Sequence, residues 1–137
     1  MELCDLLKKA KILLIDDDQY IRSSLEYYFK KKTLAFVTLE SAEEALELLK
    51  KEIFDVIICD YKLPRMNGLD FFFRLYELQP EALRIFITAY ANDEVAIRAG
   101  GIGIDDFIEK PFTTKDIEDA LQRLLEVNAP AHTSSAD

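Results

Sequence analysis

Tryptophan is absent from this sequence and histidine, cysteine and glycine are scarce, and the shortage of histidine excludes several kinds of active site. The only histidine among the 137 residues is His132, which lies near the C-terminal end in a stretch without hydrophobic periodicity. Ser-His-Asp triads, Cys-His pairs and most zinc sites need an imidazole group within the folded part of the chain. These chemistries are therefore set aside.

The two cysteines do not predict a disulfide or a thiolate metal site. Cys4 lies near the start of the chain and Cys59 lies inside an apolar run, so their settings differ. Free cysteine commonly packs as a small hydrophobic residue, and we expect this structural role for Cys59.

The sequence also lacks a membrane signal. No apolar run approaches the about 20 residues that span a bilayer. The N-terminus has no cationic lead followed by a continuous apolar core. We therefore expect a cytoplasmic protein without membrane contact.

The chain is acidic, with 26 acidic against 17 basic side chains and a formal net charge of −9. Such a charge repels the phosphate backbone of nucleic acids, so no direct nucleic acid contact is expected. The length suits one domain, and a hydrophobic content of 50% is ordinary for a globular protein. The composition therefore predicts one compact domain.

Short apolar runs predict five β-strands. The middle runs are continuously apolar, which is typical of strands in a parallel sheet that is covered on both faces. A parallel sheet needs crossover connections, which are usually helices. The predicted strands are Lys11–Ile15, Leu34–Thr38, Asp55–Cys59, Arg84–Thr88 and Asp106–Ile108.

Amphipathic patterns between these runs predict the connecting helices. Their apolar side chains recur at spacings of three and four, which places them on one helix face. Ser41 with Glu44 has the form of a capping box, and Thr113 with Asp116 is a weaker version of this signal. The apolar stripes are Ile21, Ser24, Leu25, Tyr28 and Phe29; Ala42, Ala45, Leu46 and Leu49; Leu69, Phe72, Phe73 and Tyr76; and Ile117, Ala120, Leu121, Leu124 and Leu125.

This alternation of strands and helices predicts a doubly wound α/β domain with right-handed connections. A further helix is expected after Asn92, and Gly100-Gly101 should make it soft. Residues 1–127 form the predicted domain. Residues 128–137 have no periodic stripe and are expected to be a flexible tail or the start of a linker.

Charged and polar residues follow the predicted strands. Asp16 and Asp17 follow the first strand, Asp60 the third, Thr88 ends the fourth, and Lys110 comes after the fifth. Loops beyond the carboxyl ends of parallel strands converge, so these side chains are expected at one edge of the sheet. Clustered carboxylates oppose each other's ionisation unless a cation lies among them. The three aspartates therefore predict a Mg²⁺ site, because Mg²⁺ prefers carboxylate and water oxygens.

These residue types suffice for phosphoryl transfer. With no histidine or reactive cysteine at this edge, the available nucleophile is a carboxylate, which can form an aspartyl phosphate. The metal and Lys110 would offset charge on the phosphoryl oxygens, and Thr88 could donate a hydrogen bond to one of them. Asp18 is assigned to the N-cap of the following helix instead.

The order of motifs resembles the receiver domain of response regulators in two-component regulatory systems, from about Lys11 to Val127. The resemblance implies a flavodoxin-like fold with a five-stranded parallel sheet of strand order 2-1-3-4-5 and helices on both faces. The motifs are Leu13-Leu14-Ile15-Asp16-Asp17-Asp18, Val56-Ile57-Ile58-Cys59-Asp60, Leu63-Pro64 with Met66-Asn67-Gly68, Ile87-Thr88-Ala89, and Lys110-Pro111-Phe112.

The resemblance implies a phosphoacceptor and a metal site. Asp60 would accept the phosphoryl group. Asp17 would bind Mg²⁺ directly, Asp16 would act mainly through metal-bound water, and Lys62 would contribute its main-chain carbonyl. Lys110 would contact the phosphoryl group.

The resemblance also implies a switch. Thr88 would be the hydroxyl switch residue and Phe107 the aromatic switch residue, although Phe107 lacks the hydroxyl that many receivers carry as tyrosine. Pro111 would follow a cis peptide bond.

The implied partners are those of a phosphorelay in signal transduction. The phosphoryl donor would be a sensor histidine kinase or a histidine phosphotransfer protein that docks near the first helix. A downstream protein target or a fused output domain would read a surface near the fourth and fifth helices of the repeat, and a homodimer through these helices is a family habit. The chain would be a signalling switch that catalyses only its own phosphorylation and dephosphorylation.

Two other functions remain open from the sequence. A receiver fold that has lost phosphorylation would be a constitutive protein-interaction module, although all five core positions are intact. A haloacid-dehalogenase-like phosphatase also has Asp-x-Asp after an apolar strand, but Tyr20 stands where that family has a small residue, and Asp60 and Lys110 would have no role. Whether the chain stands alone or belongs to a longer regulator also stays open.

Overall fold

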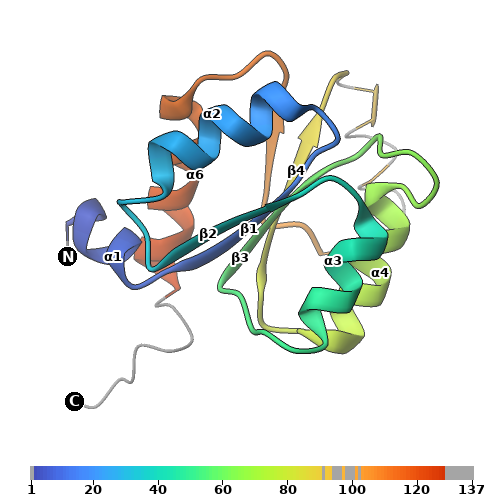
Figure 1. The fold of residues 1–137 in the computed structure, drawn as a ribbon, viewed down its shortest axis with the longest axis horizontal. Helices are drawn as coiled ribbons and strands as arrows, with labels where there is room; N and C mark the ends of the chain where they lie inside the picture. Colours follow the sequence, from blue (N-terminus) through green and yellow to red (C-terminus); the bar gives the residue numbers. More distant parts are fainter. Residues whose placement is uncertain (1, 91, 94–96, 98–100, 102, 129–137) are drawn as a thin grey trace.

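The computed structural model describes residues 2–90, 92–93, 97, 101 and 103–128. They contain a five-stranded parallel sheet in the order β2-β1-β3-β4-β5, which confirms the expected fold class (Figure 1). The strands are β1 (Lys11–Ile15), β2 (Ala35–Leu39), β3 (Val56–Asp60), β4 (Leu83–Thr88) and β5 (Asp106–Glu109).

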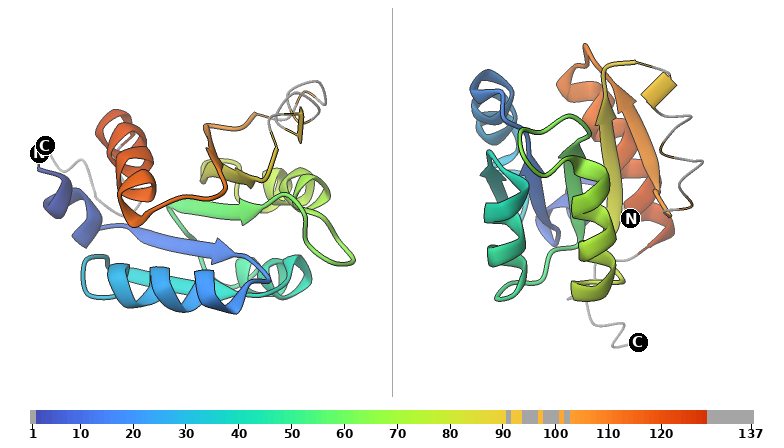
Figure 2. Two further views of the ribbon diagram at one scale, coloured as in Figure 1. Left: turned by 90° about the horizontal axis from the view of Figure 1, so that it is seen from above. Right: turned by 90° about the vertical axis from the view of Figure 1, so that its right-hand side faces the viewer.

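Helices cover both faces of this sheet. One face carries α1 (Leu3–Lys8), α2 (Gln19–Phe29) and α6 (Thr114–Val127), and the other carries α3 (Ala42–Leu49) and α4 (Gly68–Leu78). The right-hand view of Figure 2 looks onto α3 and α4, with the sheet behind them. None of the described helices is long and apolar enough to cross a membrane.

The central strand β3 explains why the apolar runs are continuous. All of its residues are buried, and successive side chains enter different cores. Val56 and Ile58 pack with α1, α2 and α6, whereas Ile57 and Cys59 pack with α3 and α4. Since side chains alternate between the faces of a strand, the part of β3 that lies between two helical layers, Val56 to Cys59, is apolar on both faces.

Four of the five strands differ by one residue at one or both ends from the sequence prediction. β4 begins at Leu83 rather than Arg84, and β5 ends at Glu109 rather than Ile108. β2 is Ala35–Leu39 rather than Leu34–Thr38, and β3 is Val56–Asp60 rather than Asp55–Cys59. Asp60 pairs in register with Ile87 of β4. Sheet pairing therefore extends through a residue type that strands usually disfavour.

The helix caps largely follow the sequence prediction. Asp18 caps α2 by accepting hydrogen bonds from the amides of Tyr20 and Ile21, at 2.8 and 3.3 Å. Thr113 and Asp116 form a complete capping box on α6, with a bond in each direction. Ser41 accepts from the amide of Glu44 at 3.2 Å. The signal judged weaker in the sequence is thus the more complete cap.

The helix α1 was not predicted. It buries Leu6 and Leu7 in the core that also contains side chains of α6. The helix expected after Asn92, with its soft Gly100-Gly101 pair, falls largely outside the described residues, as does the expected tail after Asn128.

Candidate phosphorylation site

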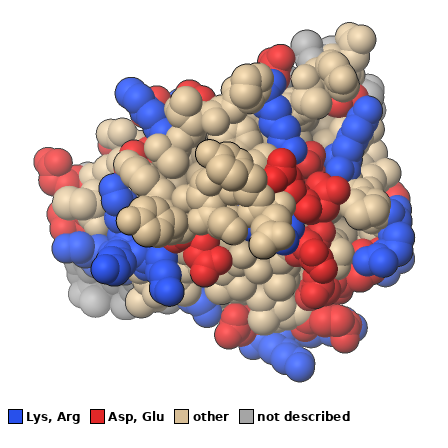
Figure 3. Space-filling model, turned by 45° about the horizontal axis from the view of Figure 1, so that its top comes forward, with Lys and Arg blue, Asp and Glu red and all other residues tan. Residues whose placement is uncertain are grey.

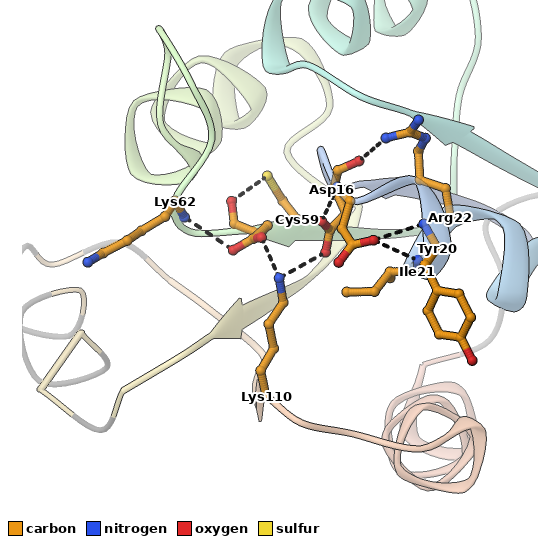
Figure 4. A network of polar contacts seen from close by, with 9 residues as sticks. Asp16, Tyr20, Ile21, Arg22, Cys59, Lys62 and Lys110 are labelled. Atoms are coloured by element: carbon orange, nitrogen blue, oxygen red, sulfur yellow. Dashed lines mark hydrogen bonds and ion pairs between the residues drawn. The ribbon is translucent and has the colours of Figure 1, made fainter.

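Asp60 ends β3 and is held by two donors at the carboxyl edge of the sheet. It is 6% exposed. Its Oδ2 accepts a hydrogen bond from Lys110 Nζ at 2.8 Å, and its Oδ1 accepts one from the Lys62 amide at 3.2 Å (Figure 4). The carboxylate is therefore oriented by a cation from one side and by the main chain of the following loop from the other.

Asp16 follows β1 and is fully buried beside this pair. Its Oδ1 accepts from the Asp18 amide at 2.9 Å, and its main-chain carbonyl accepts from Arg22 Nη1 at 2.8 Å. Its Oδ2 forms an ion pair with Lys110 at 3.4 Å but accepts no hydrogen bond within the described part of the chain. One carboxylate oxygen thus lacks the hydrogen bond that a buried oxygen normally accepts.

Burial and the neighbouring charges alter two pKa values. Burial raises the pKa of Asp16 from its ordinary value of 3.8 to about 6, against the opposing effect of the Asp18 amide, and the charge of Asp60 adds to the rise. Burial alone would lower the pKa of Lys110. The hydrogen bond with Asp60 and the charges of both aspartates outweigh it, so the pKa of Lys110 is raised. The lysine therefore stays cationic between two acids.

The donor set suits a hard divalent cation. Asp16, Asp17 and Asp60 each offer a carboxylate oxygen, and these oxygens lie within 4.8 Å of one another. Two oxygens on opposite sides of one Mg²⁺ lie about 4 Å apart, since each bond is about 2.1 Å long. Asp17 is exposed and open to solvent, and the unbonded Oδ2 of Asp16 has a lone pair to spare. These oxygens therefore fit a divalent metal ion.

Acidic side chains also gather on the surface at this edge. In the view of Figure 3 they form a band across the right half of the face, with lysine and arginine side chains around it. Such a band attracts cations toward the sheet edge.

Thr88 and Phe107 lie on neighbouring strands, Thr88 at the carboxyl end of β4 and Phe107 two residues before the end of β5. Thr88 ends β4, is 1% exposed, and its carbonyl accepts from the Lys110 amide at 2.7 Å. Phe107 is half-buried in β5, and its ring stacks on Phe86 with centroids 6.3 Å apart. The peptide bond between Lys110 and Pro111 is cis, as expected from the sequence. Thr88 and Lys110 thus lie with Asp16, Asp17 and Asp60 at the carboxyl edge of the sheet, whereas Phe107 lies further back in β5.

Cys59 is buried next to Asp60 and takes no part in the cluster. Its Sγ lies 3.4 Å from the carbonyl oxygen of Asp60. Burial raises the pKa of this thiol well above its ordinary value, and the charges of Asp60 and Asp16 add to the effect. The thiol is therefore a packing group.

Residues 12–122 match the profile of a protein family described as "Response regulator receiver domain". The chain belongs to this family.

Relatives of this receiver domain include longer proteins. Transcriptional regulatory protein GlrR of Escherichia coli (strain K12) is 32% identical over 124 residues, which cover 90% of this chain and 28% of that protein. Probable transcriptional regulator ycf27 of Guillardia theta is 33% identical over 133 residues, covering 96% of this chain and 51% of that protein. The receiver domain therefore spans less than a third of the first relative and about half of the second.

Solved structures agree with the fold. Chemotaxis response regulator CheY4 of Vibrio cholerae has a TM-score of 0.78 and 27% identity, with 85% of this chain and 99% of that chain covered. The BeF3-activated receiver domain of DrrB, a Thermotoga maritima protein, has a TM-score of 0.75 and 27% identity, with 86% and 98% covered.

Sequence reasoning missed two residues that contact the site or its loops. Arg22 of α2 donates to the carbonyl of Asp16 and lies 3.8 Å from Glu40. Glu43 of α3 bonds the loop that follows Asp60. Neither is part of a motif quoted above, and a lone charged residue on a helix surface gives no signal that distinguishes it from its neighbours.

In the metal-free receiver domain, Asp16 should make the fold less stable as the pH rises. Because its folded-state pKa of about 6 exceeds 3.8, the folded protein binds this proton more tightly than the unfolded chain does. The Asp16 contribution to the free energy of unfolding is therefore greatest below pH 3.8 and is lost as the pH rises through about 6. The loss amounts to about 2–3 kcal/mol.

Urea unfolding of wild type and Asp16→Asn in EDTA measures this contribution. Above a pH of about 6, the asparagine variant should be more stable than wild type, because it removes a buried charge. Below pH 3.8, the difference in stability should shrink. A difference in stability that does not change with pH would contradict the assignment.

Proposed function

We propose that this receiver domain accepts a phosphoryl group on Asp60 in a Mg²⁺-dependent reaction with a phosphohistidine donor. The observation that best supports this proposal is the 2.8 Å contact between Lys110 Nζ and Asp60 Oδ2. This contact lies inside a cluster of three carboxylates whose oxygens lie within 4.8 Å of one another. Phosphorylation then switches a surface that a partner reads.

We assign each residue in the cluster a role that its position supports. Mg²⁺, when bound, would offset the negative charge of the transferring phosphoryl group. Asp17 and the carbonyl of Lys62 would hold the ion directly, and Asp16 would act on it mainly through water. Asp60 supplies the attacking oxygen, Lys110 holds a positive charge beside that oxygen, and Thr88 donates to a phosphoryl oxygen.

The phosphoryl donor is proposed to be a sensor histidine kinase or a histidine phosphotransfer protein that docks beside α2. A groove of about 510 Å³ lies next to the site on this side, and most of its lining is apolar. Such a groove suits the apolar stripe of a partner helix. It is lined by Tyr20, Ile21, Ser24, Leu25, Lys110, Pro111, Phe112 and Thr114.

Thr88, Phe107 and α6 would pass the effect of phosphorylation to a binding partner. A change at Thr88 would be passed to the Phe107 ring and to the surface of α6 and the segment after Asn92, where a downstream target, a fused output domain or a second copy would bind. Residues 1–127 would be the receiver domain and 128–137 the beginning of a tail or linker, in a cytoplasmic protein. The domain catalyses only its own phosphorylation and dephosphorylation.

Intact mass after incubation with acetyl phosphate tests the proposal. We expect the mass of one phosphoryl group to be added when Mg²⁺ is present and no addition when EDTA removes it. Because the related DrrB receiver is activated by BeF3, a beryllofluoride titration followed by NMR provides a second readout. If neither reagent acts, the chain is instead a constitutive interaction module with a receiver fold.

A further inference from the structure

Residues 61–67 form the loop that joins the phosphoacceptor Asp60 to α4. The start of the loop is anchored to β4, because the Tyr61 amide donates to the carbonyl of Ile87 at 2.9 Å. The loop is closed on itself where the Gly68 amide donates to the carbonyl of Tyr61 at 2.9 Å. The position of Lys62, whose carbonyl is a proposed metal ligand, therefore depends on how this loop is held.

The far end of the loop has an unfavourable backbone conformation. Arg65 has a φ of 63°, in the left-handed region that residues with a side chain rarely adopt. Such a conformation persists only when the surroundings hold it. Contacts at residues 65 and 66 are therefore needed to fix the loop.

Glu43 of α3 supplies contacts to both residues. Its Oε2 accepts a hydrogen bond from the Met66 amide at 3.2 Å and lies 3.6 Å from Arg65 Nε. Met66 also packs against the core between the sheet and α3. A side chain from a separate element, α3, thus holds the end of the loop that is farther along the chain from β3.

The Glu43 carboxylate is well suited to this contact because it lies in the first turn of α3. The main-chain amide of Glu43 itself lowers the pKa of its carboxyl group, and the Met66 amide and the Arg65 charge lower it further. The group is therefore an ionised acceptor at neutral pH, and charge-assisted hydrogen bonds are stronger than neutral ones.

We infer that Glu43 is a positioning residue for the phosphoacceptor loop and that, by holding residues 65 and 66, it sets the position of the Lys62 carbonyl for Mg²⁺ binding. The inference rests on the proposed function, because it requires the metal site at Asp17, Asp60 and Lys62. It adds a residue from α3, outside the carboxyl ends of the strands, to the determinants of that site.

The test compares Glu43→Ala and Glu43→Gln with a matched control, Glu47→Ala. Glu47 lies one turn later on the same helix and also has an ion pair, with Lys50 at 2.6 Å, but this pair is exposed and lies outside the loop. Two quantities are measured by NMR: amide exchange at Met66 in the metal-free protein, and the Kd for Mg²⁺ in the unphosphorylated protein.

In Glu43→Ala, we expect exchange at Met66 to accelerate and the Kd for Mg²⁺ to rise about five- to tenfold, the ratio that the loss of one hydrogen bond corresponds to. Glu43→Gln should recover most of both quantities, because its amide oxygen can still accept from Met66. Glu47→Ala should match wild type in both.

The two measurements separate failure of the inference from failure of the proposed function. If wild type binds no Mg²⁺, the proposed function fails, and the role of Glu43 in metal binding fails with it. If wild type binds Mg²⁺ and the Kd of Glu43→Ala equals that of Glu47→Ala, the inference is overturned, whatever the exchange at Met66. Faster exchange with an unchanged Kd would leave Glu43 a structural residue.

Discussion

Replacing Asp60 with asparagine should abolish the phosphoryl adduct that the wild-type domain forms with acetyl phosphate and Mg²⁺. A neutral amide is not a nucleophile toward phosphorus, and it removes one carboxylate from the metal cluster. The substitution keeps the shape of the side chain, and its oxygen can still accept from the Lys62 amide. Lys110 also keeps its ion pair with Asp16. The folded structure should therefore survive while phosphoryl acceptance is lost.

Asp18→Asn is the control for this experiment. Asp18 lies at the same edge of the sheet but caps α2, and asparagine caps a helix as well as aspartate does. Intact mass should show the adduct in Asp18→Asn and not in Asp60→Asn. An adduct that persists in Asp60→Asn would show that another residue accepts the phosphoryl group.

Replacing Gly68 with alanine should destabilise the domain by about 2–4 kcal/mol, because a side chain there has no room. A Cβ atom at this position would lie 2.5 Å from the carbonyl oxygen of Asp60 and 2.6 Å from Cε1 of Phe86. The first of these atoms belongs to the main chain of β3 and cannot move without disturbing the sheet. Alanine in a helix is ordinarily favoured over glycine by about 1 kcal/mol, so the steric cost exceeds this gain.

Gly103→Ala is the matched control, since no atom lies within 4 Å of a Cβ at that position. Urea unfolding should give a much lower free energy of unfolding for Gly68→Ala and a value near that of wild type for Gly103→Ala. Equal stability of the two variants would mean that β3 and α4 can separate at little cost. The close approach also explains why the loop after Asp60 must return to the strand at a glycine.

Much of the fold follows from the sequence because its local signals are consistent. Strand β3 is continuously apolar from Val56 to Cys59, which predicted a parallel sheet with two covered faces. The caps at Asp18 and Thr113 marked helix starts correctly. The strand order came from the resemblance to receiver domains, since periodicity alone does not say which strands are neighbours.

What the sequence did not predict has physical causes. The stretch Leu3–Lys8 is a single short helix, and so few residues give a weak periodic signal; its stability comes from burying Leu6 and Leu7 rather than from local preference. The end of β3 extends to Asp60 because pairing with β4 outweighs the low strand preference of aspartate.

The candidate site also contains residues that the sequence predicted and contacts that it did not. Its aspartates and Lys110 were found because strand ends converge, a rule that applies to any parallel sheet. The contacts of Glu43 with Met66 and Arg65 depend on how α3 packs beside the loop, over a separation of 23 residues to Met66. No local pattern encodes a contact of this kind.

The burial of Cys59 gives the protein an internal reporter of strand opening. Cys4 is exposed and Cys59 is enclosed in the strand that carries Asp60, so an alkylating reagent should modify the first thiol in the native protein. The second thiol reacts only when the packing of α3 and α4 on β3 opens, because its raised pKa keeps it protonated and its burial excludes the reagent. The rate at which a second alkyl group is added therefore measures how often the strand that carries Asp60 is uncovered, without any engineered label.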